Sequence, residues 1–405
     1  MEEKQVLEQK KGITSGLSVI EAGSRFITFA VLSLFDYGAR LFMIKVRDVL
    51  KKLLVDHWIS VIILTAIELI VFLAGGIIIY MTSVKLGMKI KVIGAICGLL
   101  LIAQTILVTA VMCMKSSDAR FEKKKLALDA GRQFEQICDT RYPLLMIHGV
   151  FFRDLKCFNY WGRIPEELEK NGAKIFYGNN ESATPVEVTA KELADRVKEI
   201  VRETGCEKVN IIAHSKGGID VKYAVAKTDI APMVASITTI NTPHAGCEYA
   251  DYLLGSAPEI LKKKVANAYN TTLRSMGEHN PDFISAVSDI TTEKAKQIEE
   301  EISDFNFKDN GIYTQSVGSK MKQSTSGAFP LNMSFKLVGR FDGPNDGLVG
   351  EHSFQWGEDY TFVENKRKRG ISHGDMIDLT RENIKGFDVR EFYVQLVAKL
   401  KFQGL

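Results

Sequence analysis

The chain has 405 residues, of which 46% are hydrophobic and 25% are charged, and its formal net charge is +3. This composition is typical of a folded protein, and the length allows more than one structural unit. The small net charge, without a dense patch of lysine and arginine among aromatic residues, argues against nucleic acid as a partner. None of the six cysteines forms a Cys-x-x-Cys pair, which argues against a zinc ribbon, and their spacing leaves any disulfide open.

Residues 1–115 contain long apolar runs that predict a membrane region. One strong candidate for a transmembrane helix covers about residues 58–80 and carries a single charge, Glu68; a second covers about residues 92–114 and carries none. Each is roughly 23 residues long, which is enough to span a bilayer at about 1.5 Å per residue. Both lie too deep in the chain for a cleaved signal peptide. We therefore expect a multi-pass protein of the cell membrane.

A third apolar segment, residues 13–44, leaves the number of membrane spans open. Its charges fall within an arc of about 100° on a helix; they are Glu21, Arg25, Asp36 and Arg40. Such a stripe fits either an interfacial helix or a third span turned toward the other helices. With two spans, the distribution of flanking lysines and arginines favours a cytoplasmic catalytic domain. With three spans the domain can face outward, so the sequence leaves its side undecided.

A charged connector, residues 116–135, leads into residues 136–405, where short apolar runs alternate with helical patterns. Buried strands are predicted at residues 143–147, 173–177, 208–213, 234–240 and 335–339, and helices at residues 164–171, 189–204, 219–226 and 389–400. This alternation predicts a mostly parallel sheet with helices on both faces.

The strongest chemical signal is the run Ile211-Ile-Ala-His-Ser-Lys-Gly-Gly218. An apolar strand leads into Ser215, which is followed by two glycines and a helix, as in a nucleophile elbow. A serine at such a tight turn needs small neighbours, and Ala213 stands where glycine is usual. The helix that begins after it directs backbone N–H groups toward a developing oxyanion. We therefore expect Ser215 to be the nucleophile of a serine hydrolase.

A serine nucleophile needs a base, and in this arrangement the acid and the histidine follow the serine in chain order. Downstream, Asn345-Asp-Gly-Leu-Val349 places Asp346 in a loop, and Ile371-Ser-His-Gly-Asp375 places His373 in another. His244 follows the serine too closely and His352 lies only six residues after the acid. The order and spacing therefore indicate Ser215, Asp346 and His373 as the catalytic residues.

At these motifs the chain resembles the bacterial triacylglycerol lipases of the true-lipase family, within the α/β-hydrolase superfamily. The matching pieces occur in the family's order over about residues 140–395. They are His148-Gly-Val150, Tyr160-Trp-Gly-Arg-Ile-Pro165, Val209-Asn-Ile-Ile-Ala-His-Ser-Lys-Gly-Gly218, Asn241-Thr-Pro-His-Ala-Gly246, Asn345-Asp-Gly-Leu-Val349 and Ser372-His-Gly-Asp375.

The resemblance implies an oxyanion hole from the backbone N–H groups of Val150 and Lys216. It also implies that a helical insertion over about residues 251–310 forms a lid; a mobile lid and a fixed helical cap are both open. Asp375 stands where such lipases carry a calcium ligand. Leu379 and the loop over residues 319–331 lack suitable partners, however, so no cofactor is expected and a structural surface role for Asp375 is favoured.

The sequence thus predicts a membrane-anchored lipase or carboxylesterase that cleaves lipid or other acyl esters. A phospholipase or a deacylase of lipid-linked substrates is the alternative within the same chemistry. A catalytically inactive hydrolase fold used as a binding module is the alternative of another class, and the complete set of Ser215, Asp346 and His373 argues against it. Acyl chain, headgroup, lid mobility and oligomeric state are not specified by the sequence.

Overall fold

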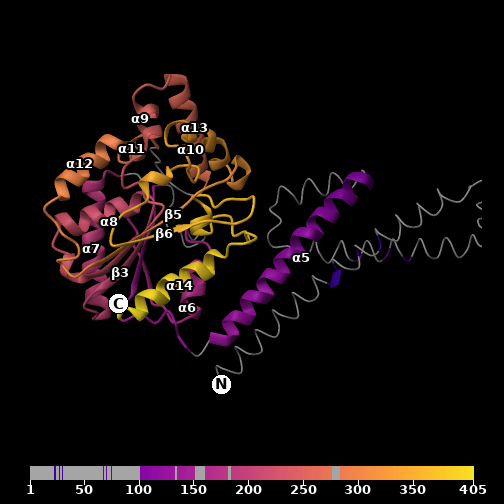
Figure 1. The fold of residues 1–405 in the computed structure, drawn as a ribbon, viewed down its shortest axis with the longest axis horizontal. Coiled ribbons are helices and arrows are strands. Elements are labelled where there is room, and N and C mark those ends of the chain that lie inside the picture. The colour runs from indigo at the N-terminus through magenta and orange to yellow at the C-terminus, as the bar shows by residue number, and fades with distance from the viewer. Residues whose placement is uncertain are drawn as a thin grey trace, which may run out of the picture. The chain divides into compact units, whose positions relative to one another are not determined.

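The computed structural model describes residues 22, 23, 27, 30, 67, 70, 74, 101–132, 135–150, 160–180, 184–275 and 283–405. The chain divides into two units, Met1–Gly131 and Arg132–Leu405 (Figure 1). The second unit contains the sheet and every residue expected to act in catalysis.

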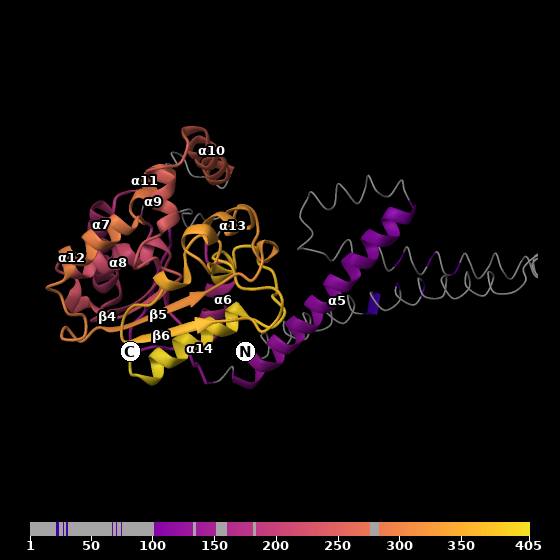
Figure 2. The same ribbon diagram turned by 45° about the horizontal axis from the view of Figure 1, so that its top comes forward.

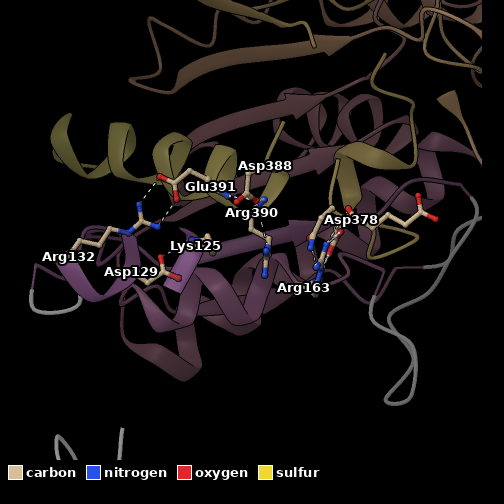
Figure 3. Close-up of polar contacts among 10 residues, drawn as sticks. Lys125, Asp129, Arg132, Arg163, Asp378, Asp388, Arg390 and Glu391 are labelled. Carbon is tan, nitrogen blue, oxygen red and sulfur yellow. Dashed lines mark hydrogen bonds and ion pairs between the residues drawn. The ribbon is translucent and has the colours of Figure 1, made fainter. Parts of the chain in front are cut away.

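In the first unit the main described element is helix α5, Leu101–Arg132. The candidate spans at residues 13–44 and 58–80 lie outside the described residues, apart from isolated positions, as do residues 92–100 of the other candidate. The predicted connector, residues 116–135, is helical as far as Arg132. An ion pair of 2.7 Å joins Lys125 to Asp129 one turn later along α5 (Figure 3). Within the described part of the chain, no helix combines the length and the apolar character needed to cross a membrane.

The second unit is built on a six-stranded parallel sheet in the order β2-β1-β3-β4-β5-β6 (Figure 1). The strands are β1 Leu144–Ile147, β2 Ile175–Tyr177, β3 Val209–His214, β4 Val234–Ile240, β5 Tyr313–Ser319 and β6 Asp359–Val363. The predictions of β1 to β4 are confirmed to within a few residues. The parallel sheet agrees with the alternation of strands and helices in the sequence.

Helices cover both faces of the sheet, as predicted. They are α6 Ile164–Lys170, α7 Val186–Thr204, α8 Lys216–Lys227, α9 Glu248–Leu254, α10 Glu259–Ser275, α11 Phe283–Ser288, α12 Thr292–Ile302, α13 Leu331–Phe341 and α14 Val389–Phe402. Successive side chains of a strand point to opposite faces. Leu144 and Met146 of β1 therefore pack with residues of α6 and α14. Leu145 and Ile147 pack on the other face with residues of α7 and α8.

The predicted strand over residues 335–339 is wrong, because these residues lie inside helix α13. The buried positions of α13 are Leu331, Ser334 and Val338, whose spacing of three and four residues is helical rather than alternating. The short run Phe335–Val338 by itself fits a strand, but together with the preceding residues from Leu331 it has a helical pattern. Asp346 consequently follows a helix and a short loop rather than a strand.

The predicted insertion is helical and contains α9 to α12; α9, α10 and α11 lie next to one another (Figure 2). Its last helix, α12, is fixed to the body of the unit by polar contacts. Lys294 forms an ion pair of 2.6 Å with Glu187 at the start of α7. On α8, Lys222 pairs with Glu299, and the Tyr223 hydroxyl donates to Glu301 at 2.8 Å. The α12 end of the insertion therefore packs on α7 and α8.

Candidate active site

Ser215 forms the tight turn between β3 and α8. Its backbone has φ 56° and ψ −134°. Residues other than glycine rarely adopt such a positive φ. Its N–H donates to the Ile240 carbonyl oxygen at 2.9 Å, which ties the turn to the end of β4. The structure thus has the geometry expected of a nucleophile elbow, with strain concentrated at the residue expected to react.

Close packing explains the glycine at position 217. A Cβ atom there would lie 2.4 Å from the His148 carbonyl oxygen, so only glycine lets α8 begin this close to the loop after β1. That loop carries Val150, and α8 begins at Lys216. The two expected oxyanion donors therefore belong to segments that touch beside Ser215. The Lys216 N–H, in the first turn of α8, has no acceptor inside its own helix.

The structure brings the predicted acid and base together. The His373 Nδ1 lies 2.6 Å from Oδ2 of Asp346, and the backbone N–H of His373 donates to the Asp346 carbonyl oxygen at 2.9 Å. Asp346 is fully buried and acts as an acceptor, so we assign the proton of this bond to Nδ1. The lone pair of His373 is then on Nε2, as a general base for a serine requires.

Further hydrogen bonds fix the Asp346 carboxylate. Its Oδ1 accepts the backbone N–H groups of Leu348 and Val349 at 2.9 and 2.8 Å, and its Oδ2 accepts the Asn241 side-chain amide at 2.6 Å. Asn241 follows the C-terminal end of β4 and also donates to the Ser319 hydroxyl at the end of β5. With its lone pairs engaged in this way, the carboxylate can hold the imidazole in one orientation.

A second histidine, His214, directly precedes the nucleophile, and its ring lies beside that of the base. Its ring centroid is 4.4 Å from that of His373. Burial lowers the pKa of His214 well below its ordinary value of 6.5, and the nearby His373 lowers it further, so the ring is neutral. The Tyr160 hydroxyl accepts the Gly149 N–H at 3.0 Å and lies 2.6 Å from His214 Nδ1, and we assign the hydroxyl proton to that second bond. Tyr160 thereby connects the loop after β1 to the nucleophile strand.

Ser215 and His373 line one and the same cavity. Val150, Tyr160 and His214 also line it. Most of its other lining residues are apolar and come from two segments, residues 328–331 and 372–380. None of the described lining residues belongs to the insertion predicted to be a lid. Apolar walls beside a serine and a histidine suit an acyl group attached to an ester.

An anchored loop carries the base. Asp378, five residues after His373, receives the Arg163 guanidinium in two contacts of 2.7 Å and the Arg163 backbone N–H at 2.9 Å (Figure 3). Such a bidentate pair fixes orientation as well as distance. The loop over residues 372–380 is therefore tied to the start of α6. The loop that carries His373 is thus held at two points, by His373 to Asp346 and by Asp378 to Arg163.

Asp375 does not have the surroundings of a calcium ligand. Its carboxylate accepts the Ser372 backbone N–H at 2.8 Å and pairs with Arg369 at 3.0 Å. Among the described residues, no group of three or more His, Cys, Asp and Glu side chains is placed to hold a metal ion. The expected surface position is wrong, because Asp375 is buried and lines the cavity. Its structural role is to close the turn that contains His373.

Two supporting residues were not found from the sequence. Asn241 and Tyr160 both stood in motifs that carried the family resemblance, yet nothing in their spacing showed what they contact. Asn241 has a positive φ of 47°, and it directly follows a buried strand parallel to the one before Ser215. The carboxyl ends of parallel strands share one edge of a sheet. The position of a polar residue at that edge could have indicated that Asn241 supports the site. No feature of the sequence indicated such a role for Tyr160.

Comparison with known proteins agrees with this geometry. Residues 166–306 match the family described as "Putative serine esterase (DUF676)". Curated triacylglycerol lipases are similar: one from Pseudarthrobacter phenanthrenivorans is 34% identical over 166 residues, which is 38% of this chain and 51% of the relative. One from Pseudomonas fragi is 27% identical over 307 residues, which is 66% of this chain and 98% of the relative. The chain is related to the triacylglycerol lipases of the α/β-hydrolase superfamily. This confirms the resemblance predicted from the sequence.

These lipase relatives are matched to different extents. The chain spans about half the length of the first two curated relatives, at 51% and 46%. Among solved structures, the mature Bacillus licheniformis lipase BlEst2 is 21% identical, with a TM-score of 0.47, and the match covers 63% of this chain and 91% of that one. The phospholipase PlaB from Legionella pneumophila is 14% identical, with a TM-score of 0.43, covering 65% and 64%.

Proposed function

We propose that the protein is a serine carboxylic ester hydrolase that cleaves lipid or other acyl esters through an acyl-enzyme on Ser215. The observation that carries the proposal is the shared cavity. The same apolar cavity is lined by Ser215 and His373. Ser215 has a strained backbone, and His373 is hydrogen-bonded to the buried Asp346. The curated relatives named triacylglycerol lipase support the same reaction class.

In the acylation step, the Ser215 Oγ attacks the ester carbonyl carbon while its proton passes to His373 Nε2. The carbonyl oxygen becomes an oxyanion that the N–H groups of Val150 and Lys216 stabilise. Asp346 does not take the proton; it holds the imidazole and stabilises the imidazolium. When the C–O bond breaks, the leaving alcohol takes the proton back from His373, and the acyl group remains on Ser215.

In the deacylation step, water attacks the acyl carbonyl carbon and His373 accepts its proton. The second oxyanion occupies the same pair of N–H groups. Its collapse releases the carboxylic acid and returns the proton to Ser215. Each step uses only side chains and backbone groups of this unit.

We further propose that residues 1–115 hold the enzyme at the cell membrane as a multi-pass protein. The support is the pair of long apolar runs at residues 58–80 and 92–114. Anchoring would concentrate the catalytic unit where lipid esters are found. Triacylglycerols and phospholipids are both candidate substrates, and the cavity's apolar walls suit the acyl part that these lipids share.

The test compares the full chain with its Ser215→Ala variant on p-nitrophenyl esters of short and long acyl chain, then on emulsified triglyceride and phospholipid vesicles. We expect turnover by the wild type and a loss of at least about a thousandfold in the variant. Reaction with a fluorophosphonate should likewise require Ser215. An unreactive serine together with no ester hydrolysis would contradict the proposal and favour the inactive binding module. Labelling without turnover would leave the nucleophile intact and reject these esters as substrates.

A further inference from the structure

The residue after the nucleophile, Lys216, has its side chain inside the protein. The exposed fraction of this side chain is 1%. Its Nζ donates to Asp220 at 2.6 Å and to the Thr184 carbonyl oxygen at 3.1 Å, and it forms an ion pair of 3.1 Å with Asp289. Of the three N–H donors of the ammonium group, hydrogen bonds to Asp220 and Thr184 use two; the contact with Asp289 is an ion pair, and its Oδ2 accepts no hydrogen bond from the described residues. Burying a lysine at this depth is tolerable only with such compensation.

The three partners come from three different parts of the chain. Thr184 precedes α7, Asp220 lies one turn further along α8, and Asp289 lies in the insertion just before α12. Through Asp289 the insertion therefore reaches the first residue of the nucleophile helix. This contact differs from the other anchors of α12, which bind Glu187 on α7 and the more distant positions Lys222 and Tyr223 on α8.

Electrostatics favour the charged form of Lys216. Burial by itself would lower its pKa, but Asp220 and Asp289 outweigh burial and raise it overall. Lys216 is thus held as a cation beside two acidic side chains. A buried cation with two anionic partners has a well-defined position, because each departure from it exposes an unpaired charge to the protein interior.

We infer that Asp289 is a positioning residue for the oxyanion hole, acting through the Lys216 side chain on the Lys216 backbone N–H. This inference rests on the proposed function. Oxyanion donors contribute most when they are fixed before the negative charge develops. At Lys216 the backbone is held on one side by the strained turn at Ser215 and on the other by a side chain whose end is clamped. The insertion thus supports catalysis through the first residue of the nucleophile helix.

The test uses the full chain with Asp289→Asn, which keeps the shape and removes the charge. Glu299→Gln is the matched control, because it breaks the contact between α12 and Lys222 without touching Lys216. The readouts are kcat, KM and the affinity for a trifluoromethyl ketone. That inhibitor forms a tetrahedral adduct on serine and places an oxyanion in the hole. Urea unfolding of each variant measures the loss of stability separately.

We expect Asp289→Asn to lower kcat and the inhibitor affinity by similar factors of about ten, with KM changed by less than about twofold. Asp289→Glu, which keeps the charge, should retain part of the wild-type kcat and inhibitor affinity. Glu299→Gln should lower only the stability. In a Lys216→Met background, Asp289→Asn should have no further effect on kcat, because the two residues act as one unit.

Two outcomes would overturn the inference while leaving the proposed function standing. In one outcome the wild type is active and the Asp289→Asn variant has the same kcat and the same inhibitor affinity as the wild type. The other is a loss in Asp289→Asn that Glu299→Gln reproduces at equal loss of stability. A wild type that neither hydrolyses esters nor reacts with fluorophosphonate would instead reject the proposed function, and the inference with it.

Discussion

The Tyr160 hydroxyl bonds to both Gly149 and His214, so it fixes the loop that carries Val150. Tyr160→Phe leaves these two buried groups without that partner, which costs about 1–3 kcal/mol. We expect the free energy of unfolding to fall by that amount. Because Val150 follows Gly149 directly, we also expect kcat for a short-chain ester to fall several-fold. Urea denaturation and steady-state kinetics measure the two effects.

A neighbouring tyrosine provides the control. Tyr393 is also buried, but its hydroxyl has no hydrogen-bond partner in the described part of the structure. Tyr393→Phe should therefore leave both the free energy of unfolding and kcat close to wild type. Equal effects of the two substitutions would show that loss of any buried hydroxyl, rather than the bridge at Tyr160, is responsible.

Asp220 predicts a pH dependence of stability. Burial raises its pKa from the ordinary 3.8 to about 6, against the opposing effect of Lys216. Between these two values the folded state binds the proton and the unfolded state does not. The stabilisation of the folded state by the proton on Asp220 is therefore fully present below pH 3.8 and is lost as the pH rises through about 6. The free energy of unfolding of wild type minus that of Asp220→Asn should fall over this window. Urea unfolding at several pH values measures it, and a flat difference would contradict the shift.

At the scale of elements, α8 and the loop after β4 approach so closely that Gly218 has no room for a side chain. A Cβ there would lie 2.2 Å from the Thr242 Oγ1 and 2.8 Å from its Cγ2. Gly218→Ala should destabilise the fold by about 1–3 kcal/mol through overpacking. The double variant with Thr242→Ala should regain part of that loss, since it removes Oγ1 and Cγ2 but keeps the Thr242 Cβ, which would lie 2.9 Å away. Thermal or urea unfolding of the single and double variants tests this; a Gly218→Ala variant as stable as wild type would contradict it.

The strands that were predicted from the sequence are those whose burial requires mainly apolar residues. Strands β1, β3 and β4 are buried along their whole length and mostly apolar, and they were predicted. Strand β5 reads Tyr-Thr-Gln-Ser-Val-Gly-Ser and was missed, because its buried polar side chains are satisfied by partners that only the fold provides. Gln315, for example, donates to Thr238 on the adjacent strand at 2.9 Å.

The predicted acid and base did not depend on predicting the elements around them. Asp346 was assigned although the strand expected before it is helix α13, because the assignment depended on the loop over residues 345–349 and on chain order. His373 followed from the same order. The contacts of Lys216 with Asp289, and of Asp346 with Asn241, join residues 73 and 105 positions apart. No local pattern encodes such pairs, so they required the structure.

At the scale of the whole molecule, residues 132–405 contain the complete sheet, its two apolar layers and the candidate site. The first residue of this unit, Arg132, is itself anchored by a bidentate pair with Glu391 on α14, at 2.6 Å for both contacts (Figure 3). We expect this unit, expressed alone, to unfold cooperatively and to hydrolyse a water-soluble short-chain ester with a kcat within about twofold of the full chain.

The comparison of that unit with the full chain also addresses the membrane region. On long-chain lipid in vesicles we expect the full chain to be the faster enzyme, because residues 1–115 would hold it at the substrate. Vesicle co-sedimentation of the two proteins measures the difference directly. Equal sedimentation and equal rates on vesicles would contradict the proposed anchoring, without bearing on the chemistry at Ser215.

The cavity walls and the clamp on Lys216 come from separate stretches of chain. Residues 328–331 and 372–380 shape the space for the acyl group, whereas Asp289 belongs to the insertion. Substrate choice and turnover rate can consequently change independently as the sequence diverges. A library of substitutions at Phe329, Leu331 and Leu379 is the place to seek new acyl selectivity, and exchanging the insertion for one from a relative would be expected to slow every substrate alike.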